Sequence, residues 1–266
     1  MFKSNRNPQF RSKFSEDIFN TKYSHEGAET LHELSCTLVN DVCQSKLTAD
    51  EKEELIDHIS NLRFIPGGRY LYYAGRDKKF FNNCYLLKAE EDNREDWAKL
   101  SWEAESCLMT GGGIGVDYSV YRQEGQILKG TGGISSGPIP KMQMINEIGR
   151  HVMQGGSRRS AIYASLNWKH ADIDQFLVSK NWHDMPVGNT GQTIFDIKQD
   201  DFNFPAPLDM TNVSVNYDTE WLLNYWETGE VGDVFKTNVY QALRTAEPGF
   251  SFNFFEKENE TLRNAC

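Results

Sequence analysis

The sequence lacks a long hydrophobic run and a secretory signal. No stretch reaches the roughly 18 consecutive apolar residues that a membrane-spanning helix needs, and residues 1–14 are polar and basic, without an apolar segment. The apolar share of 39% and the mixed charges are those of an ordinary globular protein. We therefore expect a folded cytoplasmic protein with no membrane contact.

Positive charge is also scarce. The 28 Lys and Arg residues are outnumbered by 38 Asp and Glu residues, which gives a net charge of -10. Because affinity for a nucleic-acid backbone depends on many basic contacts, we predict no nucleic-acid partner. An anionic ligand would have to be bound by a local group of residues.

Cysteines are few, and their spacing forms no known motif. Their number is odd and no CxxC pair occurs, which favours neither a zinc site nor a secreted disulfide framework. We predict no metal site, and in a reducing cytosol each thiol is free by default. The cysteines are Cys36, Cys43, Cys84, Cys107 and Cys266.

Residues 1–75 have the pattern of a helical domain. Apolar residues recur at helical spacing from Leu31 to Val42. Thr48 and Glu51 have the spacing of a capping box, which would open a second helix. The cluster at residues 66–68, Pro-Gly-Gly, should end that helix.

Residues 76–266 have the pattern of a second, α/β domain, because short strand-like runs alternate with helical segments. Five strands are predicted, at Cys84–Lys88, Ile114–Ser119, Ala161–Leu166, Asn212–Tyr217 and Phe250–Phe254. The helix before the second strand should bury Trp97, Leu100, Ala104 and Leu108, and the next should be capped by Ser136 and begin at Pro138. Residues 181–207 should form an irregular excursion. A buried parallel strand at an open edge is a liability, so we expect further strands outside this chain.

Two glycine clusters are candidates for binding a phosphate or a nucleotide base. In the first, residues 111–115, the glycines follow a helix and precede a strand, whereas a phosphate cradle needs the opposite order. This cluster is better explained as a helix stop with close packing. The second, residues 155–160, places Arg158 and Arg159 on a turn that suits phosphate binding or base stacking, although a solvated pair is an equal alternative. Residues 129–138 form another glycine- and serine-rich loop.

Several short motifs, in order, resemble those of the catalytic subunit of ribonucleotide reductase, most of all its adenosylcobalamin-dependent class II. They are Pro66-Gly67-Gly68-Arg69, Asn82-Asn83-Cys84, residues 109–115, Ser136-Gly137-Pro138, residues 155–161 and Asn264-Ala265-Cys266. The resemblance implies a ten-stranded α/β barrel built from two five-strand halves around a finger loop. The chain would be the helical N-terminal segment and the first half barrel, ending at the finger-loop tip.

The resemblance also implies roles in thiyl-radical reduction of ribonucleotides for DNA synthesis. Cys266 would carry the radical, Asn264 would hydrogen-bond the substrate, and Cys84 would be the first reducing thiol. Asn83, Gly112 and Gly113 would bind the ribonucleotide substrate. The glutamate that the family has two residues after its radical cysteine is absent, so this chain alone should be inactive.

Partners follow from the same resemblance. The second reducing cysteine is expected beyond this chain, on a complementing C-terminal chain produced by a gene split, an intein junction or a shortened form. A thioredoxin-like reductant and adenosylcobalamin would complete the reaction. A nucleoside triphosphate effector would contact Asp92, Lys129, Arg158 and Arg159, with Asp117 a weaker candidate. No long insertion lies between Tyr118 and Pro138, so we expect a homodimer of the assembled enzyme.

Two alternatives remain open. The chain could resemble a class I large subunit, whose radical comes from a separate metal-containing partner. It could also be a non-catalytic nucleotide-binding or assembly module that keeps the effector loops. Cobalamin-dependent turnover would separate the first from class II, and replacement of Cys266 would separate the second from an enzyme.

Overall fold

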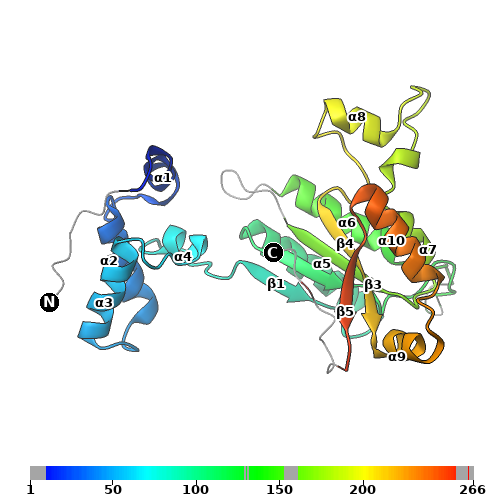
Figure 1. Ribbon diagram of the computed structural model, residues 1–266, viewed down its shortest axis with the longest axis horizontal. Coiled ribbons are helices and arrows are strands. Elements are labelled where there is room, and N and C mark those ends of the chain that lie inside the picture. The colour runs from blue at the N-terminus through cyan, green and yellow to red at the C-terminus, as the bar shows by residue number, and fades with distance from the viewer. Residues whose placement is uncertain (1–9, 129, 131, 153–160, 256–262, 264–266) are drawn as a thin grey trace. The chain divides into compact units, whose positions relative to one another are not determined.

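The computed structural model describes residues 10–128, 130, 132–152, 161–255 and 263, and it divides into two compact units (Figure 1). The first unit extends to Asn83 and the second begins at Cys84. The boundary predicted from the sequence lay after residue 75. In the described residues, no helix has the length and apolarity needed to cross a membrane.

The N-terminal unit is helical, as predicted. Its helices are α1 (Lys13–Ile18), a π-helical turn (Phe19–Tyr23), α2 (Leu31–Cys43), α3 (Ala49–Ser60) and α4 (Gly68–Tyr73). Thr48 and Glu51 form the predicted capping box of α3, and Leu34, Leu38 and Ile59 are buried in the unit's core. The prediction that residues 66–68 end α3 is wrong. That helix ends at Ser60, and the two glycines lead into α4, where Gly68 is the first helical residue.

The second unit is built on a parallel sheet of five strands whose spatial order equals their chain order. The strands are β1 (Cys84–Leu87), β2 (Gly113–Asp117), β3 (Ile162–Asn167), β4 (Thr211–Asp218) and β5 (Gly249–Asn253). All five predicted strands are confirmed, and no end is displaced by more than two residues. The predicted α/β fold is therefore confirmed.

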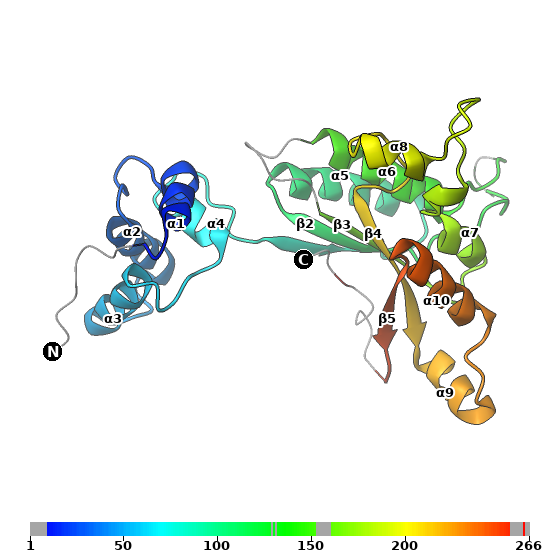
Figure 2. The same cartoon turned by 45° about the horizontal axis from the view of Figure 1, so that its top comes forward.

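The helices between the strands cover one face of this sheet, because each right-handed crossover to the next strand in line returns over the same side. Figure 2 shows α5 and α6 together above β2 and β3. The helices are α5 (Arg94–Met109), α6 (Pro138–His151), α7 (Ile173–Val178), α8 (Ile194–Asp200), α9 (Thr219–Thr228) and α10 (Asp233–Thr245), with a 3-10 turn at Trp182–Asp184. Residues 181–207 are thus not wholly irregular as predicted, because they contain α8.

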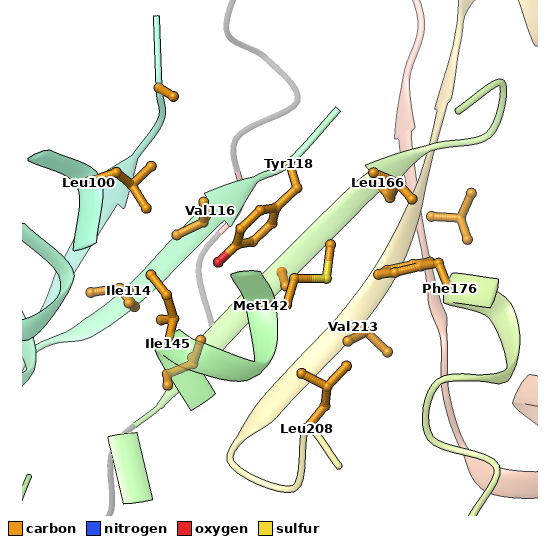
Figure 3. Close-up of a cluster of buried hydrophobic side chains, with 14 of the residues drawn as sticks. Leu100, Ile114, Val116, Tyr118, Met142, Ile145, Leu166, Phe176, Leu208 and Val213 are labelled. Carbon is orange, nitrogen blue, oxygen red and sulfur yellow. The ribbon is translucent and has the colours of Figure 1, made fainter. Parts of the chain in front are cut away.

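The core lies between the helices and that face of the sheet (Figure 3). Leu100 of α5, Met142 and Ile145 of α6 and Phe176 of α7 point toward the strands. Alternate strand residues such as Ile114, Val116, Leu166 and Val213 meet them. The four residues predicted to be the buried face of α5 are all buried.

One predicted cap is wrong. The N-cap of α6 is Gly137 and not Ser136, and Pro138 is the first helical residue as expected. Gly137 has φ of 77°, a left-handed conformation that glycine adopts without strain. The hydroxyl that stabilises this turn is that of Ser135, whose Oγ accepts a hydrogen bond from the Gly137 N–H at 3.1 Å.

Candidate functional site

The face of the sheet that points away from the helices is polar, unlike that of an ordinary parallel sheet, which is apolar on both faces. Side chains alternate between the two faces of a strand, so the residues that alternate with the core positions lie here. We call this set the polar face. It comprises Cys84, Gly113, Gly115, Asp117, Tyr163, Ser165, Asn167, Asn212, Ser214, Asn216, Asp218, Gly249, Ser251 and Asn253, with Leu86 as an apolar exception.

Hydrogen bonds run across the strands of the polar face. The amide nitrogen of Asn216 donates to Ser165 Oγ at 3.0 Å, and that of Asn167 donates to Asp218 Oδ2 at 3.1 Å. Burial raises the pKa of the Tyr163 hydroxyl. Hydrogen bonds with Ser214 and Ser251 lower this pKa and so offset part of the effect of burial. In the described part of the chain, the buried side-chain oxygen of Asn216 has no hydrogen-bond partner. The polar face therefore combines desolvated donors and acceptors with one acceptor that is still available.

Two predicted site residues lie side by side at one edge of the polar face. Cys84 begins β1 and is paired in register with Gly113, the first residue of β2. Cys84 is half-buried, whereas Gly113 is buried. Asn83 directly precedes the strand and is exposed. Gly113 places no side chain beside Cys84 on this face of the sheet.

Gly112 has a structural reason to be glycine. A Cβ atom at this position would lie 2.4 Å from Cε2 of Tyr85 and 3.3 Å from the carbonyl oxygen of Cys107. The preceding Gly111 has φ of 83° and follows the end of α5. The interpretation of this cluster as a helix stop with close packing agrees with this geometry, and the substrate-binding role of Gly112 stays a prediction.

Asp92 lies in a polar and aromatic cluster before α5. Its Oδ1 accepts a hydrogen bond from the Trp97 indole at 3.0 Å, and its Oδ2 accepts one from Arg122 Nε at 2.6 Å. Arg122 also donates to the backbone carbonyl of Asp92 at 2.5 Å. These hydrogen bonds fix the orientation of the Asp92 carboxylate. Asp117 instead ends β2 and accepts from the backbone N–H and hydroxyl of Ser119.

The other predicted residues lie outside the described residues. They are Cys266, Asn264, Lys129, Arg158 and Arg159.

Sequence reasoning missed most of the polar face and Arg122. The strand Asn212-Val213-Ser214-Val215-Asn216 alternates polar and apolar residues, which is the pattern of a strand with one polar face. That signal was present in the sequence, but no polar face was predicted from it. The role of Arg122 could not be predicted from a motif. Its contact with Asp92 depends on the course of the irregular segment that follows β2.

Comparison with known proteins agrees with this architecture. Residues 82–195 match the family described as ribonucleotide reductase, barrel domain. The vitamin B12-dependent ribonucleoside-diphosphate reductase of Thermoplasma acidophilum is 28% identical over 73% of this chain and 24% of its own length. The enzyme of the same name from Mycobacterium tuberculosis is 33% identical over 46% of this chain and 18% of its own.

Relatives of another kind match as well. The ribonucleoside-diphosphate reductase large subunit of Arabidopsis thaliana is 32% identical over 47% of this chain and 16% of its own length. In structure, the alpha subunit of the Actinobacillus ureae class Id ribonucleotide reductase superposes with a TM-score of 0.67 at 14% identity, over 92% of this chain and 41% of that one. This likeness concerns the fold alone.

The fold and these matches define a class. Residues 82–195 match a ribonucleotide reductase barrel domain, and parts of the chain are similar in sequence to B12-dependent reductases and to a reductase large subunit. It spans about a quarter or less of the length of the sequence relatives that it matches.

Proposed function

We propose that this chain supplies the substrate-reducing centre of a ribonucleotide reductase. The observation that carries the proposal is the polar face, whose strands β1 to β3 lie within the residues matched to the barrel domain and where Cys84 is in register with Gly113. A desolvated row of hydroxyl and amide groups suits the recognition of a ribose. The apolar core on the opposite side holds these strands in fixed register.

The proposed reaction uses two kinds of thiol. A sulfur radical at Cys266 removes the 3′-hydrogen atom of the ribose, and Asn264 hydrogen-bonds the substrate. The 2′-hydroxyl then leaves as water. Cys84 and a second cysteine supply the two electrons and close a disulfide, and the hydrogen atom returns to the 3′-carbon. A thioredoxin-like protein would reduce that disulfide again. Water must be kept from the radical, which favours a centre enclosed by strands.

The cofactor is proposed from relatives rather than from the site. Adenosylcobalamin would supply the radical when bound, and two of the compared relatives are named as B12-dependent. The five strands contain no histidine that could ligate cobalt. Because cobalamin carries its own nitrogen ligand for cobalt, this composition of the described strands neither supports nor opposes a cobalamin site, and we assign no step to the cofactor.

A complementing chain and allosteric control complete the proposal. The helix-facing side of β5 leaves Phe250 and Phe252 partly exposed, which supports the addition of further strands and helices at that edge. The loop at residues 129–138 and the cluster at Asp92 would bind a nucleoside triphosphate effector. The assembled enzyme would be a homodimer.

Replacement of the radical cysteine tests this function. The Cys266→Ser variant, assembled with the complementing chain, should lose ribonucleotide reduction completely and keep its affinity for deoxynucleoside triphosphates. Cys107→Ser is the matched control, because Cys107 packs beside the helix-side core and should leave turnover unchanged. If Cys266→Ser still reduced ribonucleotides, the proposal would be rejected.

A class I enzyme is the second candidate, favoured by the sequence match to the Arabidopsis large subunit. The assembled wild-type protein should turn over with adenosylcobalamin as the only added radical source. Turnover that instead required a separate metal-containing protein would select class I.

A further inference from the structure

The described residues between β2 and α6, 121–128 and 132–137, form two antiparallel arms that we call the β2–α6 loop. Ile127 and Ile134 form a bridge across it. Its arms are joined by hydrogen bonds from the Leu128 N–H to the Gly133 carbonyl at 2.8 Å and from the Ser135 N–H to the Gln126 carbonyl at 2.8 Å. The two described arms therefore have a defined conformation relative to each other.

The base of the loop is fastened to the buried carboxylate of Asp172, at the start of α7. Asp172 Oδ2 accepts a hydrogen bond from the Glu124 N–H at 2.9 Å. On the other arm, a Cβ at Gly137 would lie 2.9 Å from the same oxygen and 3.2 Å from Glu124. The two arms thus converge on one oxygen atom. Because it is desolvated, this hydrogen bond is stronger than it would be in water.

His170 makes a second attachment. The Asp172 N–H donates to Nδ1 of His170 at 3.1 Å, which leaves the ring proton on Nε2. Nε2 then donates to the backbone carbonyl of Tyr121 at 2.7 Å. Tyr121 also packs on Trp97, with ring centroids 4.4 Å apart, and Trp97 donates to Asp92. The turn after β3 is therefore connected to the cluster around Asp92.

We propose that His170 and Asp172 are positioning residues that hold the β2–α6 loop in its nucleotide-binding conformation. The turn after β3 thereby sets the effector affinity of a loop that follows β2. This inference rests on the proposed function, in which that loop binds a deoxynucleoside triphosphate. Neither residue needs to touch the nucleotide.

Two histidine variants separate the attachments. His170→Gln can keep a donor near the position of Nε2, whereas His170→Asn keeps an acceptor near Nδ1 but is too short to reach Tyr121. Asp172→Ala removes the carboxylate that Glu124 uses. Matched controls are His183→Asn, whose ring stacks on Phe195 in the excursion, and Asp174→Ala, which is exposed on the same helix as Asp172.

Hydrogen exchange and nucleotide binding are measured on each variant of the full chain, assembled with its complementing chain. In His170→Asn and Asp172→Ala, amides of residues 121–128 and 132–136 should exchange about tenfold faster, as expected for one lost hydrogen bond. Affinity for dATP, dGTP, dCTP or dTTP, whichever the wild type binds best, should fall about tenfold. His170→Gln and both controls should stay within about twofold of wild type.

The outcomes are distinguishable. Unchanged exchange in His170→Asn and Asp172→Ala overturns the inference, whatever the nucleotide results. Faster exchange with undiminished affinity overturns the positioning role. A wild-type protein that binds none of the nucleotides overturns the effector part of the proposed function, and the inference with it, even if the exchange data show that the attachment exists.

Discussion

Gly112, the residue before β2, has no space for a side chain larger than a hydrogen atom. The ring of Tyr85 occupies the space where a side chain would begin. We predict that Gly112→Ala lowers the free energy of unfolding by about 1–3 kcal/mol, because the ring or the strand must shift. Urea unfolding of the two proteins would measure the difference.

Gly130→Ala is the control for this prediction, since no atom of the described residues lies within 4 Å of a Cβ built there. Its effect on the free energy of unfolding should be below about 0.5 kcal/mol. Equal stability of wild type and Gly112→Ala would mean that the close packing against Tyr85 is not present in solution.

Single residues of the site were only partly predictable. Cys84 and Gly113 belong to short motifs that the sequence displays, and the strand register brings them together. The contact between Asp92 and Arg122 could not be predicted, because it depends on the course of an irregular segment. The attachment of the β2–α6 loop to Asp172 could not be predicted for the same reason.

At the scale of elements, α6 is tied to the segment before β4 by a buried ion pair. Arg150 donates to both carboxylate oxygens of Asp209, at 2.8 and 2.6 Å, and to Glu147 at 2.9 Å. Burial alone would raise the pKa of Asp209, but hydrogen bonds from Arg150 and Asn146 outweigh it and hold the pKa below the ordinary value of 3.8.

This ion pair makes stability depend on pH. A carboxyl group whose pKa is lower in the folded state stabilises the fold above its unfolded pKa, and that contribution is lost as the pH falls through the folded pKa. We predict that Asp209→Asn lowers the free energy of unfolding by about 3 kcal/mol at pH 7. The gap from wild type should narrow below about pH 4.

Thermal unfolding of both proteins across this pH range would test the prediction. Asp184→Asn is the control, because its partner Arg244 lies on the surface and such pairs contribute about 1 kcal/mol or less. A gap for Asp209→Asn that stayed constant down to acid pH would show that the charge of Asp209 is not the cause.

Elements were predictable where they build the core. The five strands and α5 stand out because their apolar residues repeat with the period of a buried strand or helix. The helix α8 was missed because none of its seven residues is buried, so no apolar stripe marks it. Its capping box, Thr193 with Asp196, was the one available signal.

At the scale of the whole molecule, the outer surface of α5 and α6 is unusually apolar. Trp102 and Met109 of α5 are 68% and 59% exposed, and Met144 of α6 is 59% exposed. Met109 and Met144 line one groove with Glu105 and Glu147. Exposed apolar residues gathered in this way are typical of an interface, and they support the proposed homodimer.

We predict that the double variant Trp102→Glu and Met144→Glu is monomeric under conditions in which the assembled wild type is dimeric. Carboxylates facing one another across a two-fold interface repel and are costly to desolvate. Sedimentation with a deoxynucleoside triphosphate present would measure this. Phe202→Glu, at an exposed position in the excursion, should leave the dimer intact. A wild type that stays monomeric would refute the homodimer.

The agreement between strand order and chain order affects how the molecule acquires its structure. Each strand pairs with the one made just before it, so every crossover is closed locally and no strand has to wait for a distant partner. During synthesis, β1 to β5 can be added one at a time as the polypeptide leaves the ribosome.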